Sequence, residues 1–398
     1  MVTDSALNLT SVDLFAGCGG LSLGLEEAGF RHRGLVEWDP WACTTLRANA
    51  EILELEWPVF ETDIQTFDLS RINQPIDLLA AGAPCQPFSM GGHHRADRDG
   101  RNMFPEVFRA IRFLHPRVVL LENVRGLKRP SFRPYLDYIR LQLEYPEIAP
   151  RLEEDWRDHE RRIRQHSESS AHMDPAKTYT LTASKEVLHA ADFGVSQSRH
   201  RLIMVAVRND LGVSWSYPAA THSRDRLLWD QYVTGDYWGD HGLVARQVPS
   251  QVANQVSALR HEGQEPSKAR WKTVRDELRD LDPPIIGQES KSHTFHVGIP
   301  EARIYKGHSG NDLDAPAKTI KAGSHGNPGG EHIIVKDDGS LRYLSVRECA
   351  RMQSFPDCYY FSGKRSQAIR QIGNAVPPRL ARILTERVRA MLAGSVHD

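Results

Sequence analysis

Short apolar runs alternate with helix-like stretches through the first two hundred residues. Five runs precede residue 123 and two follow it, at 12–15, 34–37, 59–62, 76–81, 118–122, 185–191 and 202–207. Between the first two runs, Leu21, Leu23 and Leu25 lie on one helix, which ends at Gly29. Strands alternating with helices are typical of a parallel sheet covered on both faces. The pattern predicts an α/β fold: a Rossmann-like, doubly wound domain with a mostly parallel sheet of seven strands.

Two regions interrupt this alternation. Residues 145–175 are charged and then Ser-rich, which is typical of a surface insertion. Residues 210–341 hold many Gly, Pro and His residues, and their periodicity is weak apart from a helix-like stretch at 271–281. Regular structure resumes at 345–353 and ends in an amphipathic helix at 378–392. We expect a second, smaller, irregular domain at 210–341, inserted into a first domain made of 1–209 and 342–398.

The composition is typical of a soluble protein from a reducing compartment. Of 398 residues, 40% are hydrophobic and 25% charged, and no apolar run is long enough for a membrane span. We expect no signal peptide, because residues 1–17 have no basic start followed by an apolar core. The five cysteines lie far apart and form no CxxC pair, which argues against a disulfide framework or a cysteine zinc site. We expect a cytoplasmic protein that uses no membrane and no metal.

A net charge of −1 conceals an uneven distribution of charge. Residues 1–90 carry 4 basic and 13 acidic side chains, whereas 95–133 and 342–398 each carry 10 basic and 4 acidic ones. Charge runs are often only solvated surfaces, and the basic stretches are equally suited to binding phosphate. The total charge therefore does not exclude a nucleic-acid partner.

A glycine-rich turn follows the first apolar run, where residues 13–20 read DLFAGCGG. Glycines let such a turn approach a ligand closely, and the helix that follows favours polar groups at its N-terminus. Ser22 stands where a dinucleotide fingerprint has its last glycine. At the next strand end, the Glu37 carboxylate can accept both ribose hydroxyls and Trp38 can pack on a purine, while Asp63 can accept from an exocyclic amine. This set favours an adenosine without a pyrophosphate; the alternative is an ordinary α/β turn.

A second group of candidate residues follows the later strands. Residues 82–89 read GAPCQPFS, which places Cys85 on a proline-stiffened loop at the sheet edge where α/β proteins bind ligands. Glu122 ends the fifth predicted strand on the same edge. Arg199 and Arg201 are two residues apart on an extended segment, so both can face that edge and bind a phosphate or a base carbonyl. His293 and His296 have a metal-like spacing but no further ligands, and we interpret them as unliganded.

Six segments of the chain resemble, in the same order, the motifs of the DNA (cytosine-5) methyltransferases, and the resemblance extends over nearly the whole chain. The matching strings are DLFAGCGGLSLGLEEAGF (13–30), GAPCQPFS (82–89), LLENV (120–124), QSRHR (197–201), RYLSVRECARMQSFPD (342–357) and QIGNAVPPRLA (371–381). The resemblance implies that Cys85, Glu122, Arg199 and Arg201 are catalytic. It implies a site for S-adenosylmethionine, with S-adenosylhomocysteine as product, at Phe15, Gly17, Cys18, Gly20, Glu37, Trp38, Asp63, Ile64, Pro84, Asn374, Ala375 and Val376. It implies substrate contacts by Gln86, Ser89 and Asn123 of the catalytic domain, and by Lys318 and Thr319 of a target-recognition domain at 210–341, whose base contacts we expect at 316–330.

The resemblance also implies a reaction and a setting. The Cys85 thiolate would add to C6 of a flipped-out cytosine, Glu122 would protonate N3, Arg201 would hold O2, and C5 would take the methyl group. We expect a monomer that acts on a specific double-stranded DNA sequence in the bacterial cytoplasm, associated with the nucleoid. There it would be the modification enzyme of a restriction-modification system, with a cognate endonuclease as a partner in that system.

The chain departs from the common pattern at two places, and three other interpretations stay open. The loop after Ser89 is short, which leaves the match of Met103 uncertain by one residue, and the insertion 145–175 has no motif counterpart. An RNA cytosine methyltransferase of the same fold is disfavoured by the length of 210–341. A non-catalytic homologue is disfavoured by the presence of Cys85 and Glu122, and a nicotinamide dehydrogenase by Ser22.

Overall fold

The computed structural model describes residues 8–72, 75–84, 102–169, 173–182, 186–323 and 330–394. The chain divides into two compact units. Unit 1 comprises Met1–Leu188, His200–Pro218 and Tyr359–Asp398, and unit 2 comprises His189–Arg199 and Ala219–Cys358. The expected boundaries of the inserted domain, 210 and 341, differ from those of unit 2, which begins later, ends later and also takes up residues 189–199.

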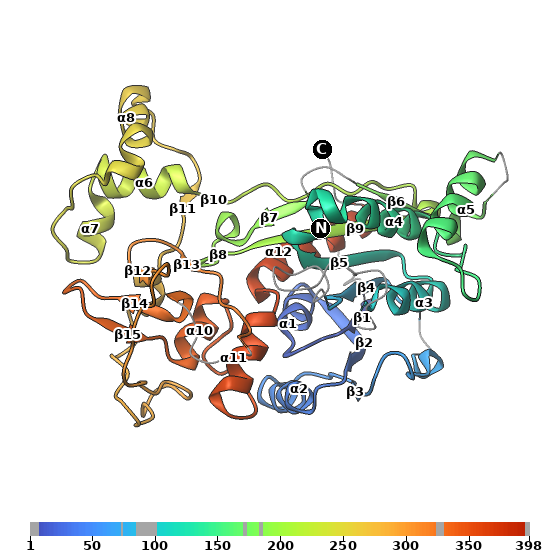
Figure 1. Ribbon diagram of the computed structural model, residues 1–398, viewed down its shortest axis with the longest axis horizontal. Helices are drawn as coiled ribbons and strands as arrows, with labels where there is room; N and C mark the ends of the chain where they lie inside the picture. The colour runs from blue at the N-terminus through green and yellow to red at the C-terminus, as the bar shows by residue number, and fades with distance from the viewer. Residues whose placement is uncertain are drawn as a thin grey trace, which may run out of the picture. The chain divides into compact units, whose positions relative to one another are not determined.

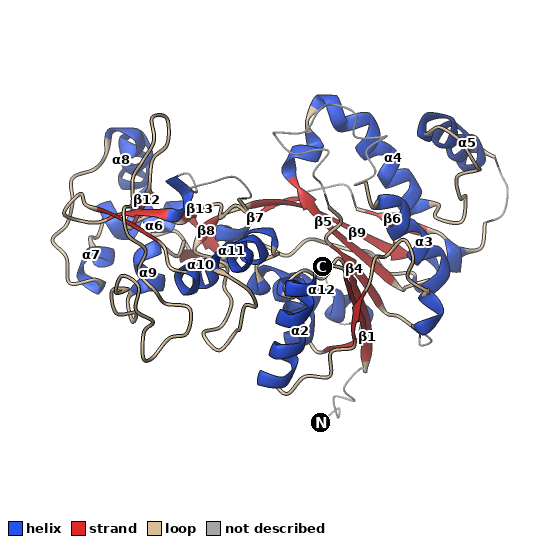
Figure 2. Ribbon diagram, turned by 60° about the horizontal axis from the view of Figure 1, so that its bottom comes forward, coloured by secondary structure: helices blue, strands red, loops and turns tan. Residues whose placement is uncertain are grey.

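Unit 1 is built on one sheet with the strand order β3-β2-β1-β4-β5-β9-β6, and β7 pairs with β9 (Figure 2). Its strands are β1 (Leu9–Leu14), β2 (Phe30–Glu37), β3 (Val59–Glu61), β4 (Leu78–Ala81), β5 (Val118–Val124), β6 (Tyr179–Leu181), β7 (Val187–His189) and β9 (His200–Arg208). Neighbours from β3 to β5 are parallel, whereas β9 is antiparallel to both β5 and β6. This confirms the predicted Rossmann-like, mostly parallel sheet. The prediction missed β6.

Helices cover both faces of this sheet (Figure 2). They are α1 (Gly20–Glu27), α2 (Pro40–Ile52), α3 (Phe104–Leu114), α4 (Arg133–Glu144), α5 (Trp156–Glu168), α11 (Arg365–Asn374) and α12 (Pro378–Leu392). Alternate strand residues such as Val12, Leu79 and Val119 form one core with α3 and α4. At the opposite ends of the chain, α1 and α12 pack against each other (Figure 1). The helix predicted at 378–392 has these bounds, because its N-terminal proline and apolar stripe are strong local signals.

The charged insertion forms a helix that packs on the main core of the unit. In α5, His159 and Ile163 are fully buried, and the Tyr138 hydroxyl of α4 lies 2.8 Å from His159 Nδ1. Trp156 packs edge-on against Tyr135, with ring centroids 5.4 Å apart. Although most of its surface is charged and exposed, the insertion is therefore attached to the core through α4.

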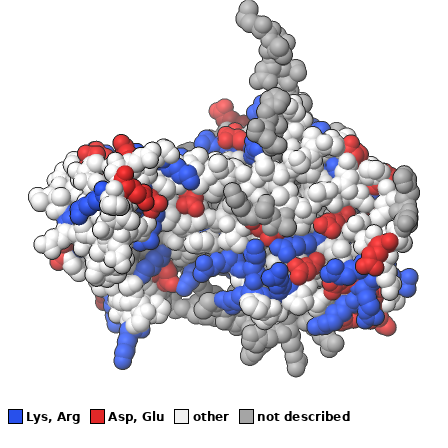
Figure 3. Space-filling view, turned by 90° about the horizontal axis from the view of Figure 1, so that it is seen from above, with Lys and Arg blue, Asp and Glu red and all other residues white. Residues whose placement is uncertain are grey.

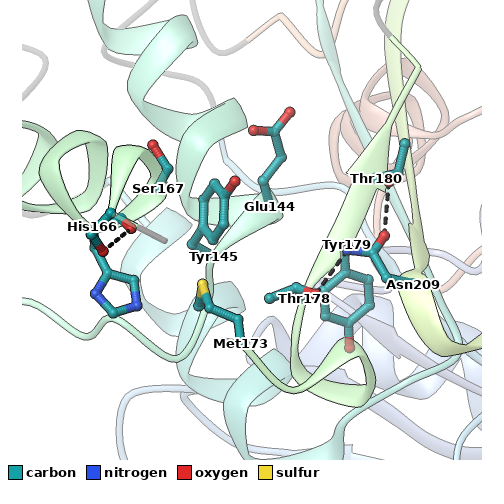
Figure 4. A pocket seen from close by; sticks show the side chains of 10 residues that line it. Glu144, Tyr145, His166, Ser167, Met173, Thr178, Tyr179, Thr180 and Asn209 are labelled. Atoms are coloured by element: carbon teal, nitrogen blue, oxygen red, sulfur yellow. Dashed lines mark hydrogen bonds between the residues drawn. The ribbon is translucent and has the colours of Figure 1, made fainter. Parts of the chain in front are cut away.

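A cavity of about 450 Å³ lies where α4, α5 and β6 meet (Figure 4). Its lining is Glu144, Tyr145, His166, Ser167, Ser169, Met173, Thr178, Tyr179, Thr180 and Asn209. Tyr179 pairs with Arg208 at the end of β9, beside the start of β5, whereas Glu122 lies near the end of β5. The cavity therefore lies near the start of β5, whereas the predicted site lies at the end of that strand.

Unit 2 combines short strands with helices, one of which, Val274–Leu278, lies within the helix-like stretch predicted at 271–281. Its helices are α6 (Arg224–Tyr232), α7 (Asp236–Asp240), α8 (Ala253–Glu262), α9 (Val274–Leu278) and α10 (Val346–Met352). Its strands are β8 (Gln197–Ser198), β10 (His222–Ser223), β11 (Ala269–Arg270), β12 (Asn311–Asp312), β13 (Ala317–Lys318), β14 (Ile333–Val335) and β15 (Leu341–Tyr343). Its helices and strands are short and joined by long loops, as expected for an irregular domain. Segment 342–358 belongs to this unit, where Arg351 bridges Asp280 and Asp357.

Candidate active site

The glycine-rich turn has the backbone conformation that its sequence requires. Gly17 and Gly19 have φ values of 57° and 84°, in the left-handed region that favours glycine. A Cβ on Gly19 would lie 2.7 Å from atoms of both Leu46 and Tyr359. Phe15 also has a positive φ, 60°. The turn leads directly into α1 at Gly20, so the N-terminus of this helix lies at the end of β1.

Glu37, at the end of β2, holds this turn in place. Its Oε2 accepts from Gly17 N at 2.8 Å, and its Oε1 accepts from Trp38 N and Asp39 N at 2.9 and 2.8 Å. Burial raises the pKa of Glu37, and the backbone hydrogen bonds act in the opposite direction. Three of about four acceptor positions are occupied, so the carboxylate retains one position for a ligand. The Trp38 side chain beside it is 72% exposed.

Beneath the turn lies a series of hydrogen bonds between buried polar residues, which the sequence did not predict. Ser22 Oγ donates to Asp13 Oδ2 at 2.6 Å, and His32 Nε2 lies 2.9 Å from the Ser22 carbonyl oxygen. Burial raises the pKa of Asp13 to about 7, with the nearby Glu37 charge contributing in the same direction. Ser22 therefore has a specific partner where a dinucleotide-binding turn would have its last glycine.

The loop after β3 is held by a side chain from α3. Arg109 Nη2 donates to the Ile64 carbonyl at 2.5 Å, and its Nη1 donates to the Phe67 carbonyl at 3.4 Å. Asp63 Oδ1 accepts from Gln65 N at 2.9 Å, which shapes the same loop. The sequence contained no local signal for Arg109, because its role depends on a loop some 45 residues away in the chain.

The C-terminal segment lies against the glycine-rich turn. Cys18 Sγ donates to the Gln371 carbonyl at 3.4 Å, and the Tyr359 hydroxyl donates to the Cys18 carbonyl at 2.6 Å. Asn374 is exposed and Ala375 and Val376 are buried. Burial raises the pKa of Cys18 to about 12, so its thiol stays protonated. The structure thus brings α11, which ends at Asn374, to the turn at the end of β1.

A carboxylate and a guanidinium meet at the end of β5. Arg201 Nε lies 2.7 Å from Glu122 Oε1, and both side chains are about nine-tenths buried. The antiparallel register of β5 and β9 produces this pairing, with Val124 opposite Arg201. A Cβ on Gly82 would lie 3.6 Å from Glu122 Oε2, so this glycine keeps the space beside that oxygen free.

The neighbouring Asn123 joins the same edge to the segment after β4. Its Nδ2 donates to the Ala83 carbonyl at 3.2 Å, and Pro84 beside it is half-buried. Residues 82–84 therefore lie next to Glu122, directly before Cys85 in the chain. Cys85, Gln86 and Ser89 lie outside the described residues, as do 324–329 of the expected base-contact segment.

The arginine motif divides between the two units. Arg199 is fully buried in unit 2 and its Nη1 donates to the Ile320 carbonyl at 3.3 Å, whereas Arg201 belongs to unit 1. In unit 2, β8 pairs with β13, the Thr319 hydroxyl donates to the Ser198 carbonyl at 2.7 Å, and Lys318 Nζ donates to the Ser309 carbonyl at 2.5 Å. The structure thus assigns Arg201 to Glu122, and joins Arg199 to the segment that holds Lys318 and Thr319.

Neither the other cysteines nor the histidine pair forms a second candidate centre. Cys18, Cys43 and Cys349 are buried, and burial raises the pKa of Cys43 to about 12. His296 lies within hydrogen-bonding distance of Ser345 Oγ and the Asp282 carbonyl. Within the described ranges, no three His, Cys, Asp or Glu side chains converge as a metal site, and no helix is long and apolar enough to cross a membrane.

Comparison with known sequences identifies the family. The sequence model of the C-5 cytosine-specific DNA methylases matches residues 9–145 and 167–390. The chain belongs to this family. It is a DNA (cytosine-5)-methyltransferase, and S-adenosylmethionine is the cofactor that its family uses. The unmatched segment, 146–166, falls within the insertion and includes most of α5.

Relatives within the methylase family match the chain over most of its length. It is 31% identical to the type II methyltransferase M.NgoMIV of Neisseria gonorrhoeae, over 96% of this chain and 97% of that one. It is 32% identical to M.Eco47II of Escherichia coli, over 94% of this chain and 76% of that one. A putative DNA modification methyltransferase from an E. coli prophage has a similar fold, with a TM-score of 0.59, 19% identity and coverage of 97% and 100%.

The cofactor end of this methylase fits S-adenosylmethionine. The Glu37 carboxylate has one acceptor position left, which suits a ribose hydroxyl, and the exposed Trp38 ring beside it offers an apolar surface for a purine. Ser22 is committed to Asp13 beneath the turn. These residues suit a nucleoside with a short polar extension.

Proposed function

We propose that Cys85, Glu122 and Arg201 carry out methyl transfer to C5 of a cytosine that is flipped out of double-stranded DNA. The Glu122–Arg201 pair is the observation that supports this most directly, because it lies beside Gly82, which is three residues before Cys85 in the sequence. Arg201 holds Oε1, so Oε2 is the oxygen available to carry a proton to N3 of the cytosine. A base in this position has its N3 edge on the carboxyl group and its O2 within reach of the guanidinium.

The bond changes balance without another reagent. The Cys85 thiolate adds to C6 while Glu122 delivers a proton to N3, and the ring electrons then reside at C5. S-adenosylmethionine would supply an electrophilic methyl group when bound, with S-adenosylhomocysteine as the product. C5 forms the new carbon–carbon bond, and loss of its proton to a base expels the Cys85 thiolate as N3 returns its proton to Glu122. The aromatic ring is then restored.

We assign the cofactor to Phe15, Gly17, Cys18, Gly20, Glu37, Trp38, Asp63, Ile64, Pro84, Asn374, Ala375 and Val376. In this arrangement, Glu37 accepts one ribose hydroxyl at Oε2 rather than both hydroxyls, because backbone N–H groups occupy its other positions. Unit 2 then serves target recognition, and Lys318, Thr319 and Arg199 act through the shape of the β8–β13 segment.

A covalent trap tests the chemistry. Duplex DNA with 5-fluorocytosine at the target position cannot lose a proton from C5, so the enzyme should remain attached and migrate as a slower band on a denaturing gel. The Cys85→Ala variant should form no such band and should still bind the duplex. Glu122→Gln should form it far more slowly, by roughly 10²–10⁴-fold. A trapped band with Cys85→Ala would refute the assignment of the nucleophile.

The biological setting is a second part of the proposal. The relatives from Neisseria and Escherichia are named type II methyltransferases, which supports a modification enzyme of a bacterial restriction-modification system, acting as a monomer in the cytoplasm beside its endonuclease. Bisulfite sequencing of DNA from cells that express the chain should show one methylated sequence context. Tritium from labelled S-adenosylmethionine that enters only transfer RNA would instead favour an RNA substrate.

A further inference from the structure

The turn that follows β5 presents a run of positive charge. From Val124 to Leu136 the chain has four basic residues and no acidic one: Arg125, Lys128, Arg129 and Arg133. All four are exposed: Arg125 and Lys128 lie on the short 3₁₀ helix η3 (Arg125–Lys128), Arg129 lies between η3 and η4 (Pro130–Phe132), and Arg133 begins α4. On the face of the molecule drawn in Figure 3, several Lys and Arg side chains lie near one another, with Asp and Glu side chains among them.

Buried residues of the same segment hold this turn rigidly. Leu127 is fully buried and Phe132 is 7% exposed, and both belong to the core beneath α4. Arg129 N donates to the Gly126 carbonyl at 3.1 Å, and Phe132 N donates to the Arg129 carbonyl at 2.9 Å. Apolar anchors thus alternate with exposed cations, so that the charges are presented by a fixed backbone.

One of the four charges is neutralised, and it braces the turn. Lys128 Nζ lies 3.4 Å from Oε2 of the fully buried Glu186, to which Arg140 Nη2 also donates at 2.5 Å. Arg133 comes no nearer than 4.0 Å to Asp137, with 75% of its side chain exposed. Within the part of the chain that the structure describes, Arg125 and Arg129 have no ion-pair partner. Three guanidinium groups therefore remain available to an anionic ligand.

Several other exposed arginines of unit 1 form ion pairs. Arg31 pairs with Glu56, Arg47 with Glu61 and Arg161 with Asp158, each at 2.6 Å. A merely solvated surface would need no such difference between these arginines and those of the turn. The unpaired charges point to a partner that supplies several negative charges in a row.

The place of the turn identifies that partner. Arg125 is three residues beyond Glu122, which at about 3.3 Å per residue is roughly 10 Å along β5. A target base at Glu122 brings its own sugar-phosphate strand to this distance. We propose that Arg125, Arg129 and Arg133 bind consecutive phosphates of the DNA strand that carries the target cytosine. This inference depends on the proposed function, which brings DNA to Glu122.

Salt dependence tests the inference, because each lost phosphate contact removes about 0.9 from the slope of log affinity against log salt. Binding of a labelled duplex with the sequence found by bisulfite sequencing is measured between 50 and 200 mM NaCl. The triple variant Arg125→Gln, Arg129→Gln and Arg133→Gln should lose about 2.7 from this slope. The corresponding triple Arg→Lys variant, which retains the charges, should recover most of it.

A matched control comes from α5. The triple variant Arg157→Gln, Arg161→Gln and Arg164→Gln removes the same charge from an exposed helix of the same unit and should leave the slope nearly unchanged. An equal loss in both triple variants would show an effect of net charge alone and would overturn the inference. So would an unchanged slope in the turn variant, or a loss confined to transfer RNA binding. If the wild-type enzyme does not methylate DNA at all, the proposed function fails instead.

Discussion

The contact between α1 and α12 leads to a quantitative prediction for Gly24→Ala. A Cβ at Gly24 would lie 2.4 Å from Ala381 Cβ, 2.6 Å from Arg382 N and 2.7 Å from the Pro378 carbonyl oxygen. Carbon atoms in contact are normally about 3.5–4.0 Å apart, so α12 must move away by about 1 Å. Two of the three atoms belong to the backbone of α12, so no side-chain rotation relieves the contact.

Two opposing terms set the size of the effect. Alanine is favoured over glycine inside a helix by about 1 kcal/mol, whereas overpacking a buried contact costs roughly 1–3 kcal/mol. Because α12 also loses contacts of the fully buried Leu380, Leu384 and Val388, we expect the upper part of that range. The net destabilisation should be about 1–2 kcal/mol. Since α1 begins at the glycine-rich turn, binding of S-adenosylhomocysteine should weaken as well.

Urea unfolding measures the loss, and hydrogen exchange of peptides from α1 and α12 locates it in unit 1. The matched control is Gly239→Ala in α7, an exposed helical glycine with no atom within 4 Å of its added Cβ. The free energy of unfolding of that variant should rise by up to about 1 kcal/mol, because alanine has the higher helix propensity. If Gly24→Ala were as stable as wild type or more so, the reasoning from the close contact would be refuted.

Three further predictions concern the cofactor end. The pKa of Asp13, about 7, lies above the unfolded value of 3.8, so its contribution to stability is full below pH 4 and is lost as the pH rises to 7. The free energy of unfolding of Asp13→Asn, relative to that of wild type, should therefore rise over that interval by at most about 1.4 kcal/mol per pH unit. Urea midpoints of the two proteins that run parallel from pH 4 to 8 would contradict this. Arg109→Ala should raise the KM for S-adenosylmethionine about ten-fold with a smaller change in kcat, because the substitution releases the Ile64 carbonyl. The Arg109→Lys variant should restore the KM. An unchanged KM in Arg109→Ala would exclude a positioning role. Glu37→Gln should weaken S-adenosylhomocysteine binding in calorimetry, because an amide N–H2 would face a backbone N–H of Gly17 or Trp38, and an unaltered affinity would remove the ribose assignment.

The local signals in the sequence were sufficient for elements whose burial follows a period. The strands that became β1, β2, β5 and β9, and the whole of α12, could be predicted because each alternates apolar and polar positions or carries a long apolar run. In unit 2, α6, α7 and α8 were missed, because their stability comes from tertiary contacts. Tyr237 and Trp238 are almost fully buried, and Tyr237 donates to Asp314 at a distance of 77 residues in sequence.

By itself, the sequence determined the chemical types present and their order: a glycine-rich turn, a cysteine loop, a strand-end glutamate and paired arginines. Only the tertiary structure decided which of these meet. The antiparallel register of β5 and β9 pairs Glu122 with Arg201, while Arg199, two residues away, is buried in the other unit. It also decided that Gly24 must be a glycine, since the atoms that would collide with a side chain belong to α12. Such partners are hundreds of residues apart or in another strand, so no local pattern of polarity can encode them.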